Sequence, residues 1–173
     1  AQMMRLNASQ VRQDFNCFGG FGQQGYGYNV EELRAEIGHI LGVDKKHSLV
    51  MIGVGNLGRA ILQNFPFAQN GFTVEAAFDV SQSVIGSVVN GVEVHSMDTL
   101  DSYLQTHNVD VVALTIPQSV AQEMATRLIN LGVKGFWNFT NVEISVPEPV
   151  FTENVHFVDT LLTLSYRISH QGQ

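Results

Sequence analysis

The sequence has little cysteine, no long apolar run and a shortage of positive charge. Its 173 residues include a single cysteine, Cys17, so a disulfide within the chain is excluded and a reducing compartment is expected. The simplest interpretation of Cys17 is a small buried hydrophobic residue. A stretch of about 18 or more consecutive apolar residues is missing, which excludes a membrane-spanning helix. The first residues also lack the basic-then-apolar order of a signal peptide, and we therefore expect a cytoplasmic protein.

The shortage of positive charge is uneven along the chain. The net charge is −7, which taken alone argues against binding of nucleic acid. Residues 48–173 hold four basic and eleven acidic side chains, whereas residues 1–30 carry Arg5 and Arg12 against Asp14 alone. The acidity therefore belongs to the C-terminal part, and a separate count for each domain is the better guide to its partners.

Residues 48–158 alternate between strand-like and helix-like patterns. The nearly continuous apolar runs are typical of strands that are buried on both faces. Alternation of strands and helices predicts an α/β fold, with a parallel sheet between two layers of helices. The expected strands are 49–52, 72–78, 92–95, 109–116, 136–139 and 155–158, and the expected helices are 56–65, 98–105 and a third that Ser119 caps and Gly132 ends.

The flanking residues have other patterns, so we expect three parts with the boundaries 1–47, 48–158 and 159–173. Residues 159–168 form an apolar helix pattern with no strand to cross over to. Such a helix must dock either on its own sheet or on a partner subunit.

The first part of the chain predicts short elements. Residues 7–15 are typical of a short capped helix. The segment 18–28 is rich in glycine with interleaved aromatic residues, which predicts a hairpin or a tight loop. Asn29 begins a further helix, with Glu32 as its partner in a capping box.

The sequence Gly53-Val54-Gly55-Asn56-Leu57-Gly58 stands between the first expected strand and the first expected helix. In that context the G-x-G-x-x-G pattern predicts a dinucleotide-binding turn. Gly53 permits the tight turn, Gly55 lets a pyrophosphate approach the backbone, and Gly58 lets the helix pack close to the strand. The amides at the helix N-terminus then bind phosphate. The alternatives are a phosphate or coenzyme A site, or a purely structural turn.

Further candidate contacts follow the other strands, because ligands of open parallel sheets bind at the carboxyl ends of the strands. Asp79 ends the second expected strand, and its carboxylate would bind the ribose hydroxyls and repel a 2′-phosphate. This predicts NAD(H) over NADP(H). Thr115 and Asn138 either bond the nicotinamide carboxamide or simply end their strands. The remaining candidates at these strand ends are Val80, Ile116 and Pro117.

The sequence shows none of the usual catalytic arrangements. A dehydrogenase needs a proton donor or acceptor near the hydride, yet none of the six histidines stands beside a Lys, Asp or Tyr in a recognisable spacing. Neither a metal-ligand cluster nor a Ser/His/Asp arrangement is evident, and we see no separate substrate domain. A cofactor site without this chemistry predicts a sensor, not an enzyme.

Several motifs along the chain occur together in one known family. They are Ser9-Gln10-Val11-Arg12-Gln13-Asp14-Phe15, Gly25-Tyr26-Gly27-Tyr28-Asn29-Val30, Gly53-Val54-Gly55-Asn56-Leu57-Gly58-Arg59-Ala60, Ala77-Phe78-Asp79, Gly135-Phe136-Trp137-Asn138-Phe139 and Leu164-Ser165-Tyr166. In these motifs the chain resembles the redox-sensing transcriptional repressors of the Rex family, and the resemblance covers essentially all of it.

The resemblance implies a partial winged-helix DNA-binding domain, N-terminally truncated, before a Rossmann domain. It implies a homodimer that exchanges its C-terminal helix, binds operator DNA when NAD+ predominates, and releases the DNA when NADH binds. Residues 7–16 would be the recognition helix and residues 19–28 the wing. The candidates to contact the nicotinamide, near or on the exchanged helix, are Phe157, His156 and Tyr166.

The resemblance also places the DNA contacts in the first part of the chain. Arg12 is the strongest candidate for a base edge. Relatives often carry a basic residue at position 13 and in the wing, so glutamine there predicts weaker attraction to phosphates. The alternative function is a CoA-binding or NAD-dependent enzyme domain without DNA binding. The expected DNA contacts are Ser9, Gln10, Arg12, Gln13, Gln24, Gly25 and Tyr28.

Overall fold

The chain divides into two compact units, residues 1–46 and residues 47–173. The division falls directly before the first strand of the large sheet. The computed structural model of the protein describes residues 13, 22–23, 27–40, 42 and 45–170.

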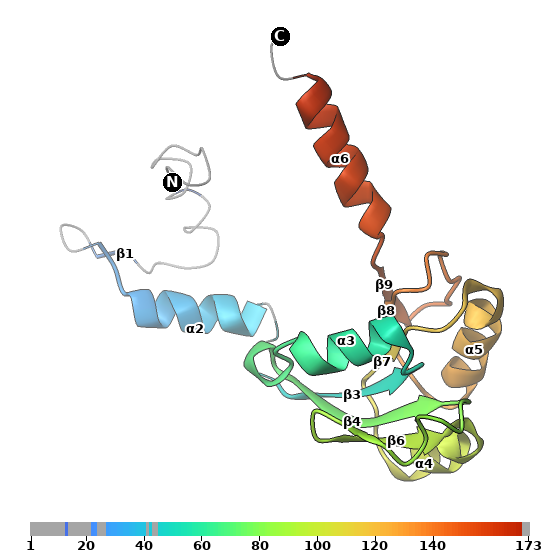
Figure 1. Ribbon diagram of the computed structural model, residues 1–173. Helices are drawn as coiled ribbons and strands as arrows, with labels where there is room; N and C mark the ends of the chain where they lie inside the picture. Colours follow the sequence, from blue (N-terminus) through green and yellow to red (C-terminus); the bar gives the residue numbers. More distant parts are fainter. Residues whose placement is uncertain (1–12, 14–21, 24–26, 41, 43–44, 171–173) are drawn as a thin grey trace. The chain divides into compact units, whose positions relative to one another are not determined.

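The first unit contains an antiparallel strand pair followed by a helix (Figure 1). Strands β1 (Gly22–Gln23) and β2 (Gly27–Tyr28) pair within the glycine-rich segment, in which the sequence predicts a hairpin or a tight loop. Helix α2 (Val30–Ile40) follows Asn29. The Asn29 side chain accepts hydrogen bonds from the backbone amides of Glu31 at 3.2 Å and Glu32 at 3.3 Å. Asn29 is therefore the N-cap that the sequence predicts.

The second unit is built on a seven-stranded sheet in the order β5-β6-β4-β3-β7-β8-β9 (Figure 1). All pairs are parallel except β5 with β6. Numbered along the chain, the parallel strands have the order 3-2-1-4-5-6, which is the Rossmann arrangement. The strands are β3 (His47–Ile52), β4 (Phe72–Asp79), β5 (Val88–Val89), β6 (Val92–Ser96), β7 (Val111–Leu114), β8 (Gly135–Asn138) and β9 (Phe151–Asn154).

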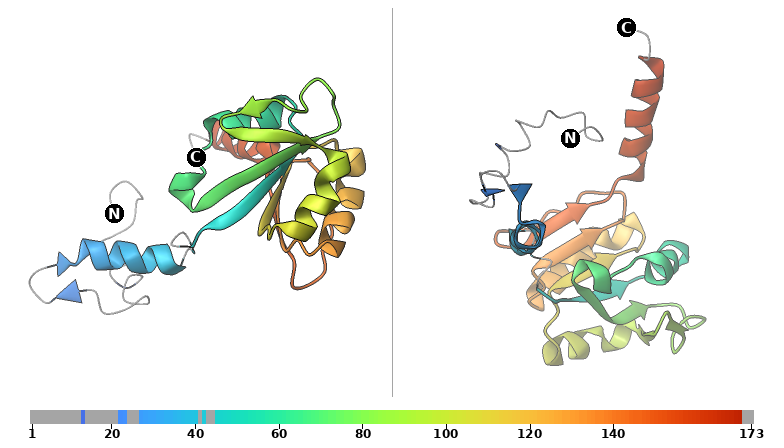
Figure 2. Two further views of the ribbon diagram at one scale, coloured as in Figure 1. Left: turned by 90° about the horizontal axis from the view of Figure 1, so that it is seen from below. Right: turned by 90° about the vertical axis from the view of Figure 1, so that its left-hand side faces the viewer.

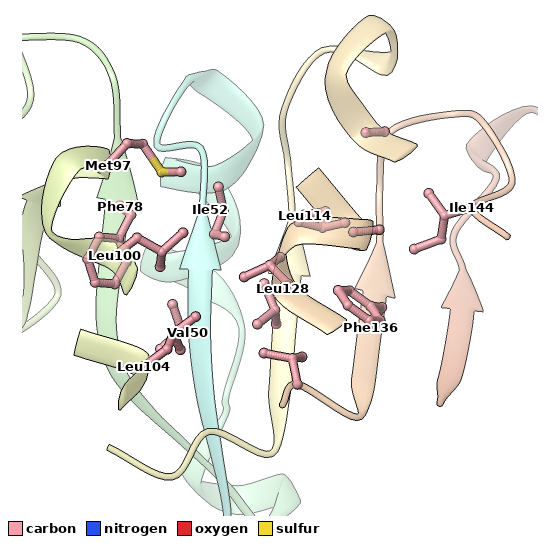
Figure 3. Packing of buried hydrophobic residues seen from close by; sticks show 14 of the residues in the cluster. Val50, Ile52, Phe78, Met97, Leu100, Leu104, Leu114, Leu128, Phe136 and Ile144 are labelled. Carbon is pink, nitrogen blue, oxygen red and sulfur yellow. The ribbon is translucent and has the colours of Figure 1, made fainter. Parts of the chain in front are cut away.

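Helices pack on both faces of this sheet (Figure 2). On one face, Leu100 of α4 and Leu128 of α5 join Val50 and Leu114 of the sheet in one buried cluster (Figure 3). On the other face, Leu62 of α3 packs against the alternate residues of β3. The sheet is thus buried on both sides, as its apolar strands predict. The helices are α3 (Asn56–Asn64), α4 (Leu100–Thr106) and α5 (Gln118–Asn130).

The prediction of the sixth strand at residues 155–158 is wrong. In the structure this strand is β9, at Phe151–Asn154. The apolar stretch instead leads into helix α6 (Phe157–Ser169), which begins after His156. A short apolar run does not distinguish a strand from the start of a helix. Edge strand β9 is partly exposed, so it lacks the continuous apolar pattern of the central strands.

Two smaller expectations also differ from the structure. Helix α5 begins at Gln118 directly after Pro117, so Ser119 lies within the first turn and is not the cap. A proline suits this position because the first helical amides need no partner within the helix. The antiparallel strand β5 was not predicted, since its two residues, Val88 and Val89, are too few for a periodic pattern.

Helix α6 projects from the sheet beyond β9 (Figure 2). Each of its residues is exposed. An exposed helix with an apolar stripe is normally stabilised by packing against another element. Among the described residues, the helices are too short or too polar to cross a membrane. The exposed large apolar side chains of α6 are Phe157, Val158, Leu161, Leu162, Leu164, Tyr166 and Ile168.

Candidate functional site

The carboxyl ends of the parallel strands form one edge of the sheet, and the strand register defines a row of residues along it. Asp79, Gly53 and Thr115 each follow one member of this row, so the fold brings these three predicted site residues together. In the sequence these three residues are separated by long stretches of chain. The members of the row are Phe78, Ile52, Leu114, Asn138 and Asn154.

Two glycines of the loop are required for steric reasons. Gly53 has a φ of +92°, a backbone region that favours glycine, and a Cβ here would lie 2.6 Å from the carbonyl oxygen of Thr115. Gly58, in the first turn of α3, packs against the backbone of Gly53, and a Cβ on Gly58 would overlap the Gly53 carbonyl oxygen. These are the turn and packing roles that the motif predicts.

Gly55 is different, because a Cβ at this position would meet no described atom within 4 Å. Gly55 is the N-cap of α3, and its carbonyl oxygen accepts the hydrogen bond of the Arg59 amide at 2.9 Å. The amides of the three residues between them precede the first helical hydrogen bond and have no acceptor within the helix. Open space in front of free amides at the positive end of a helix fits a phosphate group.

Asp79 joins the end of β4 to the glycine loop. One carboxylate oxygen, Oδ2, accepts a hydrogen bond from the Val54 amide at 2.6 Å, and Oδ1 accepts one from the Ser81 amide at 2.8 Å. A carboxylate offers about four acceptor positions, so Asp79 keeps capacity for ribose hydroxyls. Val54 is buried, and its amide is used in the hydrogen bond to Asp79. Val54 therefore stabilises the structure of the loop. Val80, beside Asp79, is exposed.

Thr115 holds the glycine loop from the opposite side. Its hydroxyl donates to the Gly53 carbonyl oxygen at 2.6 Å, with the Ile52 carbonyl oxygen at 3.2 Å. The hydroxyl proton is therefore used within the protein, and Thr115 keeps only acceptor capacity for a carboxamide. Ile116 also contacts the loop, because its Cγ2 lies 3.0 Å from the position of a Cβ on Gly53. Pro117 precedes α5.

Asn138 is 1% exposed, and its side-chain amide is fully used. The Nδ2 group donates to the Val142 carbonyl oxygen at 2.6 Å and to Asn154 Oδ1 at 2.7 Å. Asn138 Oδ1 accepts from the Thr140 amide at 3.1 Å and from the Thr140 hydroxyl at 2.6 Å. A bond to a carboxamide would have to replace one of these. Of the two roles considered for Asn138, the geometry therefore supports the structural one.

Phe157 lies close to this edge at the start of α6. Its ring stacks on that of Phe139, with centroids 6.3 Å apart and planes at 27°. Phe139 directly follows Asn138 and is buried, whereas Phe157 is half exposed. Phe157 thus packs beside the carboxyl end of β8, and its contact with a nicotinamide stays a prediction.

Most of the expected DNA contacts fall outside the described residues, namely Ser9, Gln10, Arg12, Gln24 and Gly25. Of the other two, Gln13 is helical and exposed. Tyr28 lies in β2, paired with Gly22 of β1. The roles of all seven residues in DNA binding stay predictions.

Sequence reasoning missed Asn154, a hydrogen-bond partner of Asn138. The only sequence signal was an amide at the end of a polar strand, which is too common to be informative. Among the described residues, no group of three or more His, Cys, Asp or Glu side chains is placed to hold a metal ion. Desolvation by burial, and then the Glu75 carboxylate, raises the pKa of Tyr103, which belongs to α4 and not to the row.

Comparison with known proteins identifies relatives along the whole chain. Residues 44–142 match the model of a protein family described as CoA binding domain. The redox-sensing transcriptional repressor Rex of Clostridium tetani is 49% identical over 168 residues, which are 97% of this chain and 80% of that protein.

Solved structures agree with this relationship. The crystal structure of RSP in complex with β-NAD+ and operator DNA has a TM-score of 0.89 and 44% identity, covering 98% of this chain and 78% of that chain. The crystal structure of RSP in complex with β-NADH has a TM-score of 0.86 and 39% identity, covering 98% of this chain and 79% of that chain. RSP is a Rex-family repressor. The chain therefore belongs to the Rex family of redox-sensing transcriptional repressors.

Proposed function

We propose that this protein is a redox-sensing repressor that binds NAD(H) at the carboxyl edge of its sheet and operator DNA through its first unit. The observation that carries the proposal is the open space over Gly55, with free helix amides on one side and Asp79 on the other. Relatives that match nearly the whole chain were crystallised with NAD+, NADH and operator DNA.

We propose that each part of the dinucleotide is bound by particular groups of the site. The pyrophosphate lies over Gly55 on the amides of Asn56 and Leu57, because this helix end is positive and uncovered. The adenine ribose lies against Asp79, whose negative charge disfavours a 2′-phosphate and so selects NADH over NADPH. The nicotinamide extends past Thr115 toward Phe157, in the direction of the neighbouring strand ends. The cofactor supplies the redox state that is sensed, and the protein supplies the binding.

We propose a homodimer in which α6 packs on the second copy. The apolar side chains of α6 are exposed. The sheet of the same unit also has an apolar hollow of about 370 Å³. Both features call for an apolar partner surface. The protein acts in the cytoplasm, where operator DNA and NAD(H) are present together. The hollow is lined by Leu49, Phe65, Phe67, Phe72, Val111, Gly135, Phe136, Trp137, Phe151, Thr152 and Glu153.

The alternative, a CoA-binding or NAD-dependent enzyme domain without DNA binding, is less well supported. Relatives that align with nearly the whole chain are named as repressors and not as enzymes. The match to a family named for CoA is a reason to include CoA in the binding test.

A ligand titration tests the cofactor. Trp137, the single tryptophan, lies on β8 next to Asn138, so its emission can report bound NADH by energy transfer. We expect NADH and NAD+ to bind with measurable affinity and CoA to bind much more weakly. CoA binding as tightly as NADH would contradict the proposed function.

A DNA titration tests the switch. The homodimer is first used to select its preferred duplex from a random pool, and binding is followed by fluorescence anisotropy. NADH should weaken binding of that duplex by about 5- to 150-fold, the usual range of coupling between two sites, whereas NAD+ should leave it bound. Equal DNA affinity with either cofactor would contradict redox sensing.

A further inference from the structure

The side chains of Asn138 and Asn154 form a hydrogen-bonded pair between β8 and β9. The two residues are register partners, and Asn138 Nδ2 donates to Asn154 Oδ1 at 2.7 Å. Asn154 is the last residue of β9, and only Val155 and His156 separate it from α6. The pair therefore lies at the point where the sheet edge passes into the exposed helix.

The orientation of the Asn138 side-chain amide is determined by the partners of both its oxygen and its nitrogen. Asn138 Oδ1 receives the amide and the hydroxyl of Thr140, and the second Nδ2 proton goes to the Val142 carbonyl oxygen. A flipped Asn138 would place its Nδ2 group against the Thr140 amide, so one arrangement is strongly preferred. A buried amide whose hydrogen bonds are all made, as that of Asn138 is, rigidifies the groups that it joins.

Among the described residues, two printed contacts join the start of α6 to the sheet, and on the sheet side they involve Asn138 and its neighbour Phe139. The Val155 amide donates to the Asn138 carbonyl oxygen at 2.8 Å. The Phe157 ring stacks on Phe139. All residues of α6 are exposed in the single chain, so these contacts are the ones that join the helix to its own sheet.

The same residues connect to the glycine loop through an unbroken series of contacts. The Phe139 amide donates to the Leu114 carbonyl oxygen at 2.9 Å. Leu114 precedes Thr115, whose hydroxyl binds the Gly53 carbonyl oxygen. A ligand that displaces the ends of β7 or β8 therefore acts on the residues that hold the start of α6.

We propose that Asn154 is a positioning residue which, through Asn138, makes the first turn of α6 respond to occupation of the nucleotide site. The inference rests on the proposed function, since it requires NADH to bind at the carboxyl edge. Asn154 does not contact the cofactor in this proposal. Its hydrogen bond transmits a displacement of the sheet edge to residues 155–160, which would otherwise move independently.

Hydrogen exchange in the intact homodimer, with and without NADH, measures this response. In the wild-type protein NADH should change the exchange rate of the amides in residues 155–160 by about fivefold or more, the lower end of ordinary coupling. Asn154→Leu, which removes the acceptor, should abolish that change. Both proteins are compared at saturating NADH, so that a change in NADH affinity does not alter the comparison.

Two variants isolate the hydrogen bond. Asn154→Asp keeps an acceptor oxygen for Asn138 and should retain the response. Thr152→Val, two residues earlier on β9, removes a buried hydroxyl that has no hydrogen-bond partner among the described residues and should also retain it. If Asn154→Leu melts below the assay temperature, Asn154→Ser replaces it, because its side chain is too short to reach Asn138.

The outcomes distinguish this inference from the proposed function. A wild-type protein that binds no NADH would contradict the proposed function itself. NADH binding without a change in residues 155–160 would contradict the inference alone. It would also be overturned if Asn154→Leu responds as the wild type does, or if Asn154→Asp loses the response together with Asn154→Leu.

Discussion

At the scale of single residues, the three glycines of the loop have different constraints. Gly53 and Gly58 face protein atoms, so their missing side chains let β3, β7 and α3 approach one another. Gly55 faces open space, so folding does not require glycine there. Its small size matters only if a ligand occupies that space. The loop thus separates the requirements of folding from those of binding.

Alanine substitutions at Gly55 and Gly58 should therefore affect different properties. The change at Gly58 should lower stability, and the change at Gly55 should weaken NADH binding. Gly58→Ala should lower the free energy of unfolding by about 1–3 kcal/mol, because its Cβ overlaps a backbone carbonyl that cannot easily move. Gly55→Ala should stay within about 0.5 kcal/mol of the wild type in stability yet bind NADH more weakly. Thermal unfolding and calorimetric titration measure the two effects. Undiminished NADH affinity of folded Gly55→Ala would argue against a pyrophosphate at this position.

Asp79 has two functions that substitution can separate. Asp79→Ala removes both the acceptor of the Val54 amide and the partner of the ribose, and should weaken NADH binding by about 1–3 kcal/mol. Asp79→Asn keeps one acceptor oxygen for Val54 but loses the charge, so it should bind NADPH better relative to NADH. Competitive titration of the two cofactors checks both results. Unchanged NADH affinity of Asp79→Ala would remove this residue from the site.

At the scale of elements, α6 is a helix of the second unit in which every residue is exposed. It has 13 residues, and isolated helices of this length are marginal in water. Its apolar stripe therefore needs another surface, and its short connection to β9 directs it away from its own sheet (Figure 1). Association with a second copy satisfies this need.

Substitutions on the two sides of α6 test that association. Leu161 and Thr163 are both exposed, but two residues along a helix lie on nearly opposite faces. Leu161→Asp should shift the protein from dimer to monomer in sedimentation experiments, because a charge would enter the apolar contact. Thr163→Asp serves as the matched control and should remain dimeric. Dimers of equal stability in both variants would show that this face of α6 is not the interface.

At the scale of the whole molecule, charge separates the two units. The second unit is acidic and repels a phosphate backbone, which supports the proposal that the first unit binds DNA. That unit holds five basic and five acidic side chains, with glutamine at positions 13 and 24. Because these charges balance, each arginine that contacts DNA contributes a large share of the electrostatic attraction.

Arg12→Ala should weaken operator binding and flatten its dependence on salt. If Arg12 neutralises one phosphate in each subunit, the slope of log affinity against log salt concentration should fall by about one for each arginine removed. If Arg12 reads a base edge, the loss should instead be about 1–3 kcal/mol and confined to the preferred sequence. Anisotropy titrations of specific and random duplexes at several salt concentrations distinguish these cases. Equal affinity of variant and wild type for both duplexes would exclude a DNA contact.

The central strands could be predicted from sequence, because β3 and β7 are buried on both faces and their apolar runs are continuous. Edge strands β5 and β9 could not, since partial exposure removes that pattern. In the site, Gly53 and Asp79 follow from local rules of turn and strand end. The hydrogen bonds of Thr115 and Asn138 do not, because no local pattern specifies which groups they meet.

The sequence by itself determined the α/β fold, the glycine-rich turn after the first strand of the sheet and the helix at residues 157–169, because each depends on residues that are close together in the chain. Only the tertiary structure decided the use of side chains such as those of Thr115 and Asn138. Thr115 forms a hydrogen bond with Gly53, which lies 62 positions away in the sequence. Asn138 forms one with Asn154, which lies 16 positions away. These contacts depend on strand order and register, which arise from packing the whole sheet.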